Sequence, residues 1–406
     1  MSRPHIVLYG HFGVGNLGND TTLEAMLYNT KKYQPTASIT CVCTGAQVIA
    51  KRFGIPTLPI DVNEDRNIRW TATARPHKLV RLTTRVVDEL DFWVRRTRWF
   101  RSVDQFIVVG TGALDDMAVV HPWSAPYDLF KWCRAAKLGG AKVIFLSVGA
   151  GPILHPLSRT LMLDALGVAD YRSYREVASL EYLRGVGFDT TQDHLYPDLV
   201  FSLPLKLASP PAPVSSQIKT VGLGVIGYYG WQHNIKSGEP LYRDYVSKLK
   251  QFVDWLLDQG YCIRLLTGDL PTDQGPIDEI LKFVRSEGQD HWQERVKAEP
   301  IATAEDLYQQ LTQTDIVVAA RFHNLLAALM VGRPVISTGY HKKNDNLLAE
   351  MGLQEYCQHI EHLDVERLIV QFQSLASKLS EASQRIQQKN TQYRQLLDEQ
   401  FCRILD

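Results

Sequence analysis

The chain has 406 residues, of which 45% are hydrophobic and 22% charged, and its formal net charge is zero. A length of this order favours two domains of about 200 residues each, and such proportions are typical of globular chains that bury real cores. A neutral balance argues against a whole-protein attraction to nucleic acid, so no nucleic-acid partner is predicted.

The lack of a recognisable signal peptide and the spacing of the cysteines predict a reducing compartment. The N-terminal sequence reaches a glycine after the four-residue apolar run Ile6–Tyr9, which is too short for a signal peptide. No apolar stretch of roughly 18 or more residues follows, so we expect a cytoplasmic location, with the inner face of the membrane as an alternative. The six cysteines show no C-x-x-C pair and no zinc spacing, which favours reduced, packed thiols.

The first half alternates short β-branched runs with helical patterns, which predicts a parallel sheet with crossover helices. One helix is expected at Thr21–Tyr33, because Thr21 and Glu24 have capping-box spacing. A second helix is expected at Tyr174–Leu183. The predicted strands are Ile6–Tyr9, Ile39–Thr44, Gln105–Val109 and Val143–Val148.

The second half repeats this alternation after a proline-rich stretch. Leu203–Gln217 holds four prolines and three serines and is typical of a linker. The tail from Asp364 onward carries apolar residues at helical spacing, Leu368, Phe372, Leu375 and Leu379, which predicts a covering helix. The strands and helices predicted between them are Thr220–Ile226, Leu241–Leu257, Cys262–Thr267, Ala304–Thr314, Ile316–Ala320, Asn324–Val331 and Val335–Thr338.

These patterns predict an α/β fold with two Rossmann-like lobes, parallel sheets, a GT-B-like arrangement and a C-terminal helical tail. The N-terminal lobe, expected on the acceptor side, carries the glycine-rich loop. The C-terminal lobe is expected on the donor side. The predicted divisions are 1–204 for the first lobe, 205–218 for the linker, 219–362 for the second lobe and 363–406 for the helical segment.

A glycine-rich loop, Gly10–Gly18, follows the first strand and precedes the first helix. Backbone N–H groups and the positive end of a helix favour an anion at such a place. Gly13, Gly15 and Gly18 fit G-x-G-x-x-G, but a dinucleotide fold also needs an acid at the end of the second strand, and Thr44–Gln47 has none. A tight turn with no ligand remains an alternative.

In the second lobe, Arg321 and His323 stand where a buried strand ends and an apolar helix begins. The C-terminal ends of parallel strands are where open α/β sheets bind ligands. Arginine offers a planar fork for carboxylate or phosphate, and histidine donates a hydrogen bond or carries a proton. The alternative is structural, with Arg321 paired to a nearby acid such as Asp315 and His323 packed as a satisfied core residue.

Taken together, these segments resemble the polysaccharide pyruvyl transferase family. The family's opening glycine loop, its G-G-G-x-L-x-D segment, its G-x-G-P turn, its R-D-x-x-S helix start, its D-P-x-F strand and its R-x-H motif all have counterparts, in the same order. The departures are Asn19 for an aspartate, with Asp20 next, Glu176 for an aspartate and Leu199 for a proline. The matching segments are Gly13–Gly18, Gly110–Asp116, Ser147–Pro152, Arg175–Ser179, Pro197–Phe201, Arg321–His323 and, beyond them, Gly332, Pro334, Tyr340, Lys343, Gly352 and Leu353.

The resemblance implies transfer of the pyruvyl group of phosphoenolpyruvate onto two hydroxyls of a sugar as a ketal, in cell-surface or exopolysaccharide biosynthesis. It implies Arg175 and Arg321 as cationic forks for the donor, with His323 and Lys343 as further donor-binding residues. Asp116 and His323 are the candidate catalytic pair, with the acid and base roles left open between them. The acceptor-side loop residues are Gly13, Gly15, Asn16, Gly18, Asp20, Gly110 and Gly112.

No cofactor is predicted besides phosphoenolpyruvate as co-substrate, and no metal, because arginines suffice for its charge. The expected acceptor is a sugar or a lipid-linked oligosaccharide, and the oligomeric state is left open. One rival is a GT-B-type glycosyltransferase that uses a nucleotide sugar, for which Asp269 and Asp273 are the available acids. The other rival is a non-catalytic binding protein on the same fold.

A basic, aromatic stretch lies in the first lobe. Residues 75–101 hold eight Lys or Arg against three acids, with Phe92, Trp93, Trp99 and Phe100 interleaved. Such a segment can rest on an anionic membrane surface or hold a lipid diphosphate. It can equally form helices whose aromatic side joins the core while the arginines are solvated, and both interpretations stay open.

Overall fold

A computed structural model describes residues 3–61, 78–116, 121–205, 218–230, 235–268, 270–286 and 292–405. The chain divides into two compact units. Unit 1 comprises Met1–Val14, Thr22–Ser202 and Leu396–Asp406. Unit 2 comprises Gly15–Thr21 and Leu203–Gln395. Gly15–Thr21 and Leu396–Asp406 thus group differently from the predicted limits, which place them in the N-terminal lobe and the C-terminal segment. Most of the expected linker, 206–217, lies outside the described residues.

Unit 1 is built on a parallel sheet, which in the described part of the chain has seven strands in the order β3-β2-β1-β4-β5-β6-β7. Its central strands are buried on both faces and therefore read as continuous apolar runs. This explains why the four predicted strands of the first half are confirmed to within a residue or two. The strands are β1 His5–Gly10, β2 Ser38–Cys43, β3 Thr57–Pro59, β4 Gln105–Val109, β5 Lys142–Val148, β6 Tyr171–Tyr174 and β7 His194–Leu195.

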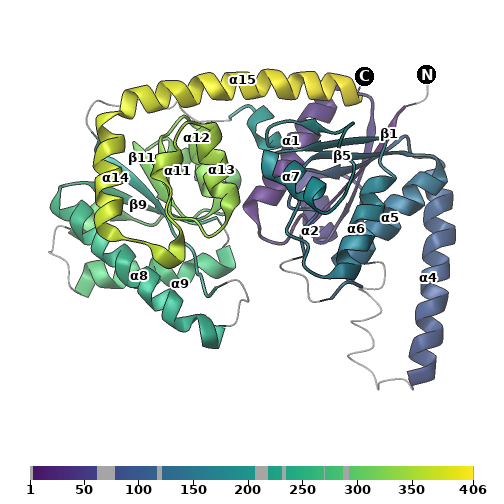
Figure 1. Cartoon of the computed structure of the whole chain (residues 1–406), viewed down its shortest axis with the longest axis horizontal. Coiled ribbons are helices and arrows are strands. Elements are labelled where there is room, and N and C mark those ends of the chain that lie inside the picture. The colour runs from purple at the N-terminus through teal and green to yellow at the C-terminus, as the bar shows by residue number, and fades with distance from the viewer. Residues whose placement is uncertain are drawn as a thin grey trace. The chain divides into compact units, whose positions relative to one another are not determined.

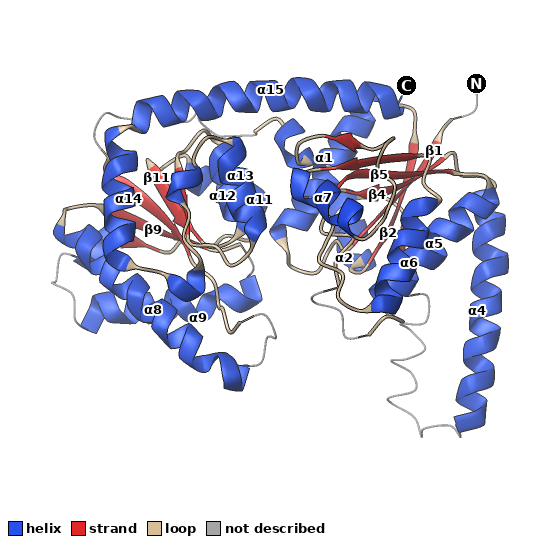
Figure 2. Cartoon of the chain, viewed as in Figure 1, coloured by secondary structure: helices blue, strands red, loops and turns tan. Residues whose placement is uncertain are grey.

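Helices connect these strands and cover the sheet (Figures 1 and 2). Helices α4, α5 and α6 lie side by side. A short 3-10 helix, η1, covers Leu199–Ser202. The helices are α1 Leu17–Tyr33, α2 Ala46–Phe53, α4 Lys78–Phe100, α5 Ala125–Gly139, α6 Pro156–Gly167 and α7 Val177–Gly185.

Helix α4 turns its aromatic side into the core of unit 1. Phe92 and Phe100 are buried, and each packs edge-on against the ring of Trp132 on α5. Trp93 and Trp99 pack against the same cluster. The aromatic side of this stretch therefore joins the core, as the second interpretation predicts. Any membrane contact has to use the opposite face of the helix.

Unit 2 is also built on a parallel sheet, with five strands in the described residues and the order β10-β9-β8-β11-β12. The central strand β8 pairs with β9 and β11, so the carboxyl ends of these strands meet at one edge. The strand predictions for this half are confirmed, with ends shifted by one or two residues. The strands are β8 Thr220–Gly224, β9 Cys262–Leu266, β10 Val296–Lys297, β11 Ile316–Ala319 and β12 Val335–Ser337.

The helices of unit 2 lie on both faces of this sheet, with α8, α9 and α14 on one side and α11, α12 and α13 on the other (Figure 1). The apolar stripe predicted for the tail is confirmed, since Leu368, Phe372 and Leu375 are fully buried. The helices are α8 Ile235–Asp258, α9 Leu270–Ser286, α10 Trp292–Arg295, α11 Ala304–Leu311, α12 Phe322–Met330, α13 Lys342–Glu350, α14 Val365–Ser377 and α15 Leu379–Leu405, with 3-10 turns η2 Gln354–Tyr356 and η3 Ile360–His362.

The long helix α15 is divided between the two units, and each part has its own contacts. Asn390 Nδ2 donates to the Leu329 carbonyl of unit 2 at 2.8 Å. The last turns belong to unit 1, where Gln400 is buried and its Nε2 donates to Ser173 Oγ at 2.7 Å. The helix is thus more than the simple cover predicted for the tail.

Three predicted helix starts are wrong, and the largest difference is in α8, which begins at Ile235 and not at Leu241. Helix α1 begins at Leu17, so Thr21 lies inside it and donates its hydroxyl to the Leu17 carbonyl at 2.7 Å instead of capping the helix. Tyr174 ends strand β6, and its helix begins only at Val177. Tyr174 belongs to a strand because it pairs with Val148 of β5. Strand pairing is a tertiary contact that a helical apolar pattern does not reveal.

Candidate functional site

The glycine loop between β1 and α1 is a tight turn. Gly13 and Gly15 have φ values of 76° and 87°, a left-handed conformation that favours glycine. Gly13 also lies against Gly45, whose carbonyl oxygen would be 2.6 Å from a Cβ at position 13. Asn16 caps α1, because its Oδ1 accepts the Asn19 N–H at 3.1 Å. Backbone geometry and capping explain these residue types, and their role toward an acceptor stays a prediction.

The last glycine of the loop lies beside a predicted catalytic residue. Gly18 belongs to the same compact unit as His323. A Cβ at Gly18 would be 1.8 Å from Cδ2 and 1.9 Å from Nε2 of the His323 ring, so no larger residue fits without moving the imidazole. Asp20, two residues further on, lies within α1 and is buried. The structure therefore brings Gly18 and His323 together.

In unit 1, the loops after β4 and β5 interlock at the carboxyl edge of the sheet. Gly149 donates its N–H to the Thr111 carbonyl at 2.8 Å, and Leu114 bridges to Ala150. Gly110 has no room for a side chain, since a Cβ there would be 2.6 Å from the Ser147 carbonyl oxygen. The two glycine-rich segments found in the sequence, Gly110–Asp116 and Ser147–Pro152, thus pack backbone against backbone in one layer.

Asp116 is buried and uses both carboxylate oxygens to hold that layer. Its Oδ1 accepts the Leu154 N–H at 2.7 Å, and its Oδ2 accepts the His155 N–H at 2.8 Å. These bonds position the turn before α6, as carboxylates at helix starts commonly do. The proposed role as a base stays a prediction, and this geometry adds a structural role to it.

Arg175 directly follows β6 and forms an ion pair with Asp198. Its Nη1 donates to Asp198 Oδ2 at 3.0 Å, and the two side chains are only 9% and 8% exposed. The guanidinium lies along Gly149, where a Cβ would be 3.2 Å from Nη2. Arg175, Gly149 and Asp198 therefore form one cluster at the carboxyl edge of the sheet in unit 1.

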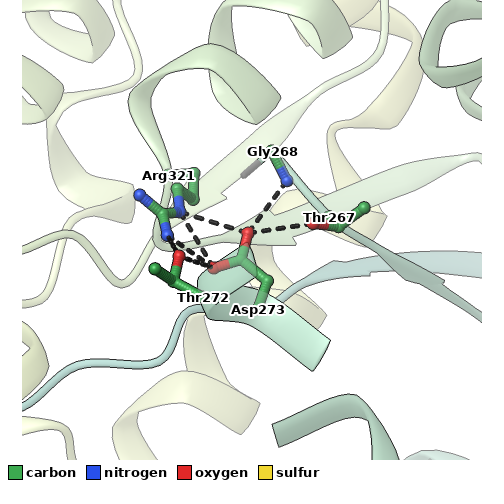
Figure 3. A network of polar contacts seen from close by, with 5 residues as sticks. All are labelled: Thr267, Gly268, Thr272, Asp273 and Arg321. Carbon is green, nitrogen blue, oxygen red and sulfur yellow. Dashed lines mark hydrogen bonds and ion pairs between the residues drawn. The ribbon is translucent and has the colours of Figure 1, made fainter. Parts of the chain in front are cut away.

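Arg321 occupies the equivalent place in unit 2, between β11 and α12, and its partner is Asp273 near the start of α9 (Figure 3). The guanidinium donates to Asp273 through Nη2 at 2.6 Å and through Nε at 3.1 and 3.2 Å. It also donates to the hydroxyl of Thr272. The Asp273 carboxylate accepts the Gly268 N–H at 3.0 Å and the Thr267 hydroxyl at 3.1 Å.

The structural alternative for Arg321, pairing with a nearby acid such as Asp315, holds for a different acid. Asp315 does not pair with it but accepts the backbone N–H groups of Lys219 and Thr220 at 2.8 and 3.0 Å. Asp315 thus fixes the start of β8, at the opposite end of that strand from Arg321. The true partner lies 48 residues before Arg321 in the chain, where local sequence gives no sign of it.

Lys343 and His323 both lie close to the ring of Phe322. The Lys343 Nζ stands over the Phe322 ring, 5.4 Å from its centroid, and the rings of Phe322 and His323 are 5.7 Å apart. His341 caps α13 by accepting the Lys343 N–H at 3.0 Å. The structure thus gathers Arg321, His323 and Lys343 around the starts of two helices, where helix dipoles favour an anion.

Asn324 is a member of this site that the sequence did not single out. Its side chain is fully buried, and neither amide atom has a hydrogen-bond partner among the described residues. It is wedged between strand ends, since a Cβ at Gly224 would be 2.6 Å from its Nδ2 and one at Gly268 would be 2.7 Å from its Oδ1. The adjacent arginine and histidine motif was the only available signal for it.

Tyrosines flank the same edge on the loops after β8 and β12. Tyr228 and Tyr340 have ring centroids 5.5 Å apart, and the Tyr228 hydroxyl donates to Glu361. Burial, together with Glu361, raises the pKa of Tyr228 above its ordinary value, so this phenol stays protonated even in alkaline solution. Such rings provide apolar faces with neutral hydrogen-bonding groups beside the cationic residues.

Within the described residues, no group of three or more His, Cys, Asp or Glu is placed to hold a metal ion. Among the described helices, none combines the length and the apolar character that crossing a bilayer requires. Of the six cysteines, Cys41, Cys43 and Cys133 are buried, as predicted for packed thiols, whereas Cys402 is exposed.

A family model described as polysaccharide pyruvyl transferase matches residues 16–342. No match is found among curated proteins. The matched range contains every predicted donor-binding residue except Lys343, which is the next residue after it.

Solved structures of low sequence identity share the fold. The UDP-GlcNAc 2-epimerase from Methanocaldococcus jannaschii has a TM-score of 0.58 at 10% identity, covering 92% of each chain. The UDP-GlcNAc 2-epimerase from Neisseria meningitidis, bound to UDP-GlcNAc, scores 0.56 at 12% identity and covers 96% of this chain and 100% of its own. An alpha,alpha-trehalose-phosphate synthase (UDP-forming) from Burkholderia vietnamiensis scores 0.54 at 8% identity, covering 100% and 98%. The predicted GT-B-like fold class is confirmed.

Proposed function

Because the chain belongs to the polysaccharide pyruvyl transferase family, we propose that it moves the pyruvyl group of phosphoenolpyruvate onto two hydroxyls of a sugar as a cyclic ketal. The acceptor in this proposal is a sugar of a cell-surface or exopolysaccharide, free or lipid-linked. The observation that carries the proposal is the cluster of Arg321, His323 and Lys343 at the carboxyl edge of the sheet in unit 2.

That cluster suits a small anion. Phosphoenolpyruvate has a phosphate and a carboxylate on three carbons, and each is matched by a guanidinium fork or an ammonium group. Arg321 supplies the directional fork, while Lys343 and His323 lie at the starts of α13 and α12, where helix dipoles favour negative charge. Arg175 of unit 1, held by Asp198, is the second guanidinium assigned to the donor by family resemblance.

The reaction balances without an additional reagent. A proton adds to the methylene carbon of phosphoenolpyruvate, and the first sugar hydroxyl attacks the carbon that bears the phosphate. The C–O bond to phosphate then breaks, and the second hydroxyl attacks the resulting oxocarbenium carbon. The two hydroxyl protons end on the new methyl group and on phosphate. His323 and Asp116 are the proposed proton carriers, each worth roughly 10²–10⁴ in rate.

The test is phosphate release from phosphoenolpyruvate by the purified chain, with a panel of galactosides as acceptors and detection of the pyruvylated product. Arg321→Ala is expected to lower turnover by about 100-fold or more, the scale of losing one charge-stabilising donor. The matched control is Arg243→Ala, which removes an exposed arginine paired to Glu239 on α8 and leaves turnover unchanged. Turnover that survives Arg321→Ala would remove the donor assignment.

The alternative function, a nucleotide-sugar glycosyltransferase, needs an acid that binds a ribose, and one of its two candidates is already engaged. Asp273 is fully buried and its carboxylate binds Arg321, Gly268 and Thr267, so it is not placed to grip a ribose. Asp269 lies outside the described residues. Competition of phosphoenolpyruvate against UDP-sugars in equilibrium binding separates the two functions, and preferential UDP-sugar binding would favour the rival.

A further inference from the structure

Asp273 is a buried carboxylate of unit 2 with several hydrogen bonds, and it has no role in the proposed reaction. Asp273 is fully buried, and an unpaired charge at such a place is costly. It lies in the first turn of α9, where the positive end of the helix favours a carboxylate. A buried, multiply bonded acid beside a ligand-binding arginine is a common device for fixing the orientation of that arginine.

We propose that Asp273 is the positioning residue of Arg321, setting the plane of its guanidinium toward the phosphate or carboxylate of the donor. The inference rests on the proposed function, since it assumes that Arg321 contacts the donor. Asp273 itself does not touch the donor in this assignment and acts only through Arg321.

The contacts fix the guanidinium in direction as well as place. Nη2 and Nε of Arg321 both donate to Asp273, at 2.6 Å and at 3.1 to 3.2 Å, which is a fork-to-fork pairing that holds two planar groups together (Figure 3). Rotating the guanidinium requires breaking both bonds, together with the bond to Thr272. The side chain is therefore held in one orientation.

Asp273 is in turn anchored to the end of strand β9. Gly268 N–H and Thr267 Oγ1 donate to Oδ2 at 3.0 and 3.1 Å, and Thr272 Oγ1 donates to Oδ1 at 3.2 Å. The network thus runs from the backbone after β9, through the carboxylate, to the arginine after β11. The pair has no net charge, so Arg321 contributes geometry and directed N–H groups, while His323 and Lys343 contribute the further donors.

The central experiment compares Asp273→Asn with a matched control, Asp315→Asn. Both change a carboxylate of unit 2 that accepts N–H groups, but Asp315 accepts those of Lys219 and Thr220 and does not contact Arg321. We expect Asp273→Asn to raise the KM for phosphoenolpyruvate at least tenfold and to leave the acceptor KM within twofold. Asp315→Asn is expected to lower the unfolding midpoint and leave both KM values unchanged.

A second variant covers the case in which Asp273→Asn does not fold. Thr272 is exposed, and its hydroxyl contacts both Arg321 and Asp273. Thr272→Val is expected to fold and to raise the donor KM about threefold, because one support of the guanidinium is lost while the fork remains. The positioning role is overturned by an unchanged donor KM in folded Asp273→Asn, or by equal effects of Asp273→Asn and Asp315→Asn. If Asp273→Asn does not fold, an unchanged donor KM in Thr272→Val overturns it.

Binding of inorganic phosphate, measured by calorimetry, separates this inference from the proposed function. If wild-type protein shows no phosphoenolpyruvate-dependent turnover, the proposed function fails. Phosphate affinity then decides the positioning role by itself: a tenfold loss in Asp273→Asn with none in Asp315→Asn supports it. Equal phosphate affinity in wild type and Asp273→Asn contradicts it.

Discussion

Units 1 and 2 place an arginine in the same way, but they hold it differently. Each arginine lies just beyond the end of a parallel strand, Arg175 after β6 and Arg321 after β11, and each pairs with a buried acid. Asp198 reaches Arg175 through a single bond of 3.0 Å, whereas Asp273 receives both Nε and Nη2 of Arg321. A single bond neutralises a charge, and a fork also fixes its direction.

The two units differ again at their surfaces. Among the described residues, the large apolar side chains that are exposed belong to unit 1, with the single exception of Val370. Four of them lie on the outward side of α4, namely Val86, Val87, Leu90 and Val94, at 53% to 68% exposure. Singly exposed apolar residues are ordinary, but a stripe on one helix marks a contact surface. Unit 1 therefore carries the surface on which the predicted membrane contact depends.

The largest expected effect concerns the ion pair of unit 1. Asp198→Ala leaves the nearly buried Arg175 without its carboxylate, so the free energy of unfolding should fall by about 3–5 kcal/mol. Urea denaturation followed by tryptophan fluorescence measures this. The double variant Arg175→Met with Asp198→Leu is the control and should recover most of the loss. A cost near that of an exposed ion pair would show that Asp198 is not comparable to Asp273.

A matched pair of glycines tests how tightly each arginine site is packed. Gly268→Ala puts a Cβ 2.7 Å from Oδ1 of the buried Asn324, so we expect a loss of about 1–3 kcal/mol from overpacking. Gly149→Ala puts its Cβ 3.2 Å from Nη2 of Arg175, a less severe contact, and should cost less. Thermal unfolding compares the two. A larger loss at Gly149 would reverse the order of rigidity.

The pH dependence of unit 1 tests the glycine loop. Burial lowers the pKa of His11, whose Nδ1 lies 2.9 Å from Thr44 Oγ1. The folded state then binds fewer protons than the unfolded state below pH about 6.5, so stability falls as the pH falls through that range. His11→Gln is expected to reduce the loss of unfolding midpoint between pH 7 and pH 5. An identical loss in both proteins would exclude His11 as its source.

The smallest expected effect on stability lies on the outward face of α4. Leu90→Glu is expected to change the free energy of unfolding by about 0.5 kcal/mol or less, because the side chain is 61% exposed. If this face contacts anionic lipid, flotation with phosphatidylserine vesicles should capture the wild type and lose Leu90→Glu. Val370→Glu, the exposed counterpart in unit 2, is the control and should float like the wild type. Absence of wild-type flotation would remove the membrane contact.

Much of this molecule follows from local pattern. The element types follow from the apolar runs of β1, β4 and β11 and from the tail stripe through Leu368 and Phe372. Burial on both faces of a sheet requires a continuous apolar run, and burial of one helix face requires apolar residues at helical spacing. The arginine and histidine after β11 were also found in this way, since strand ends are where parallel sheets bind ligands.

Tertiary structure decided the partners. The aromatic residues of α4 fit a membrane or a core equally well, and only packing against Trp132 selects the core. Proximity in the chain suggested Asp315 for Arg321, while the fold brings Asp273 from 48 residues away. Periodicity fixes which way a side chain faces along its own helix or strand, but a hydrogen bond between distant segments depends on how strands β9 and β11 are ordered in the sheet. That order is set by the packing of the whole unit.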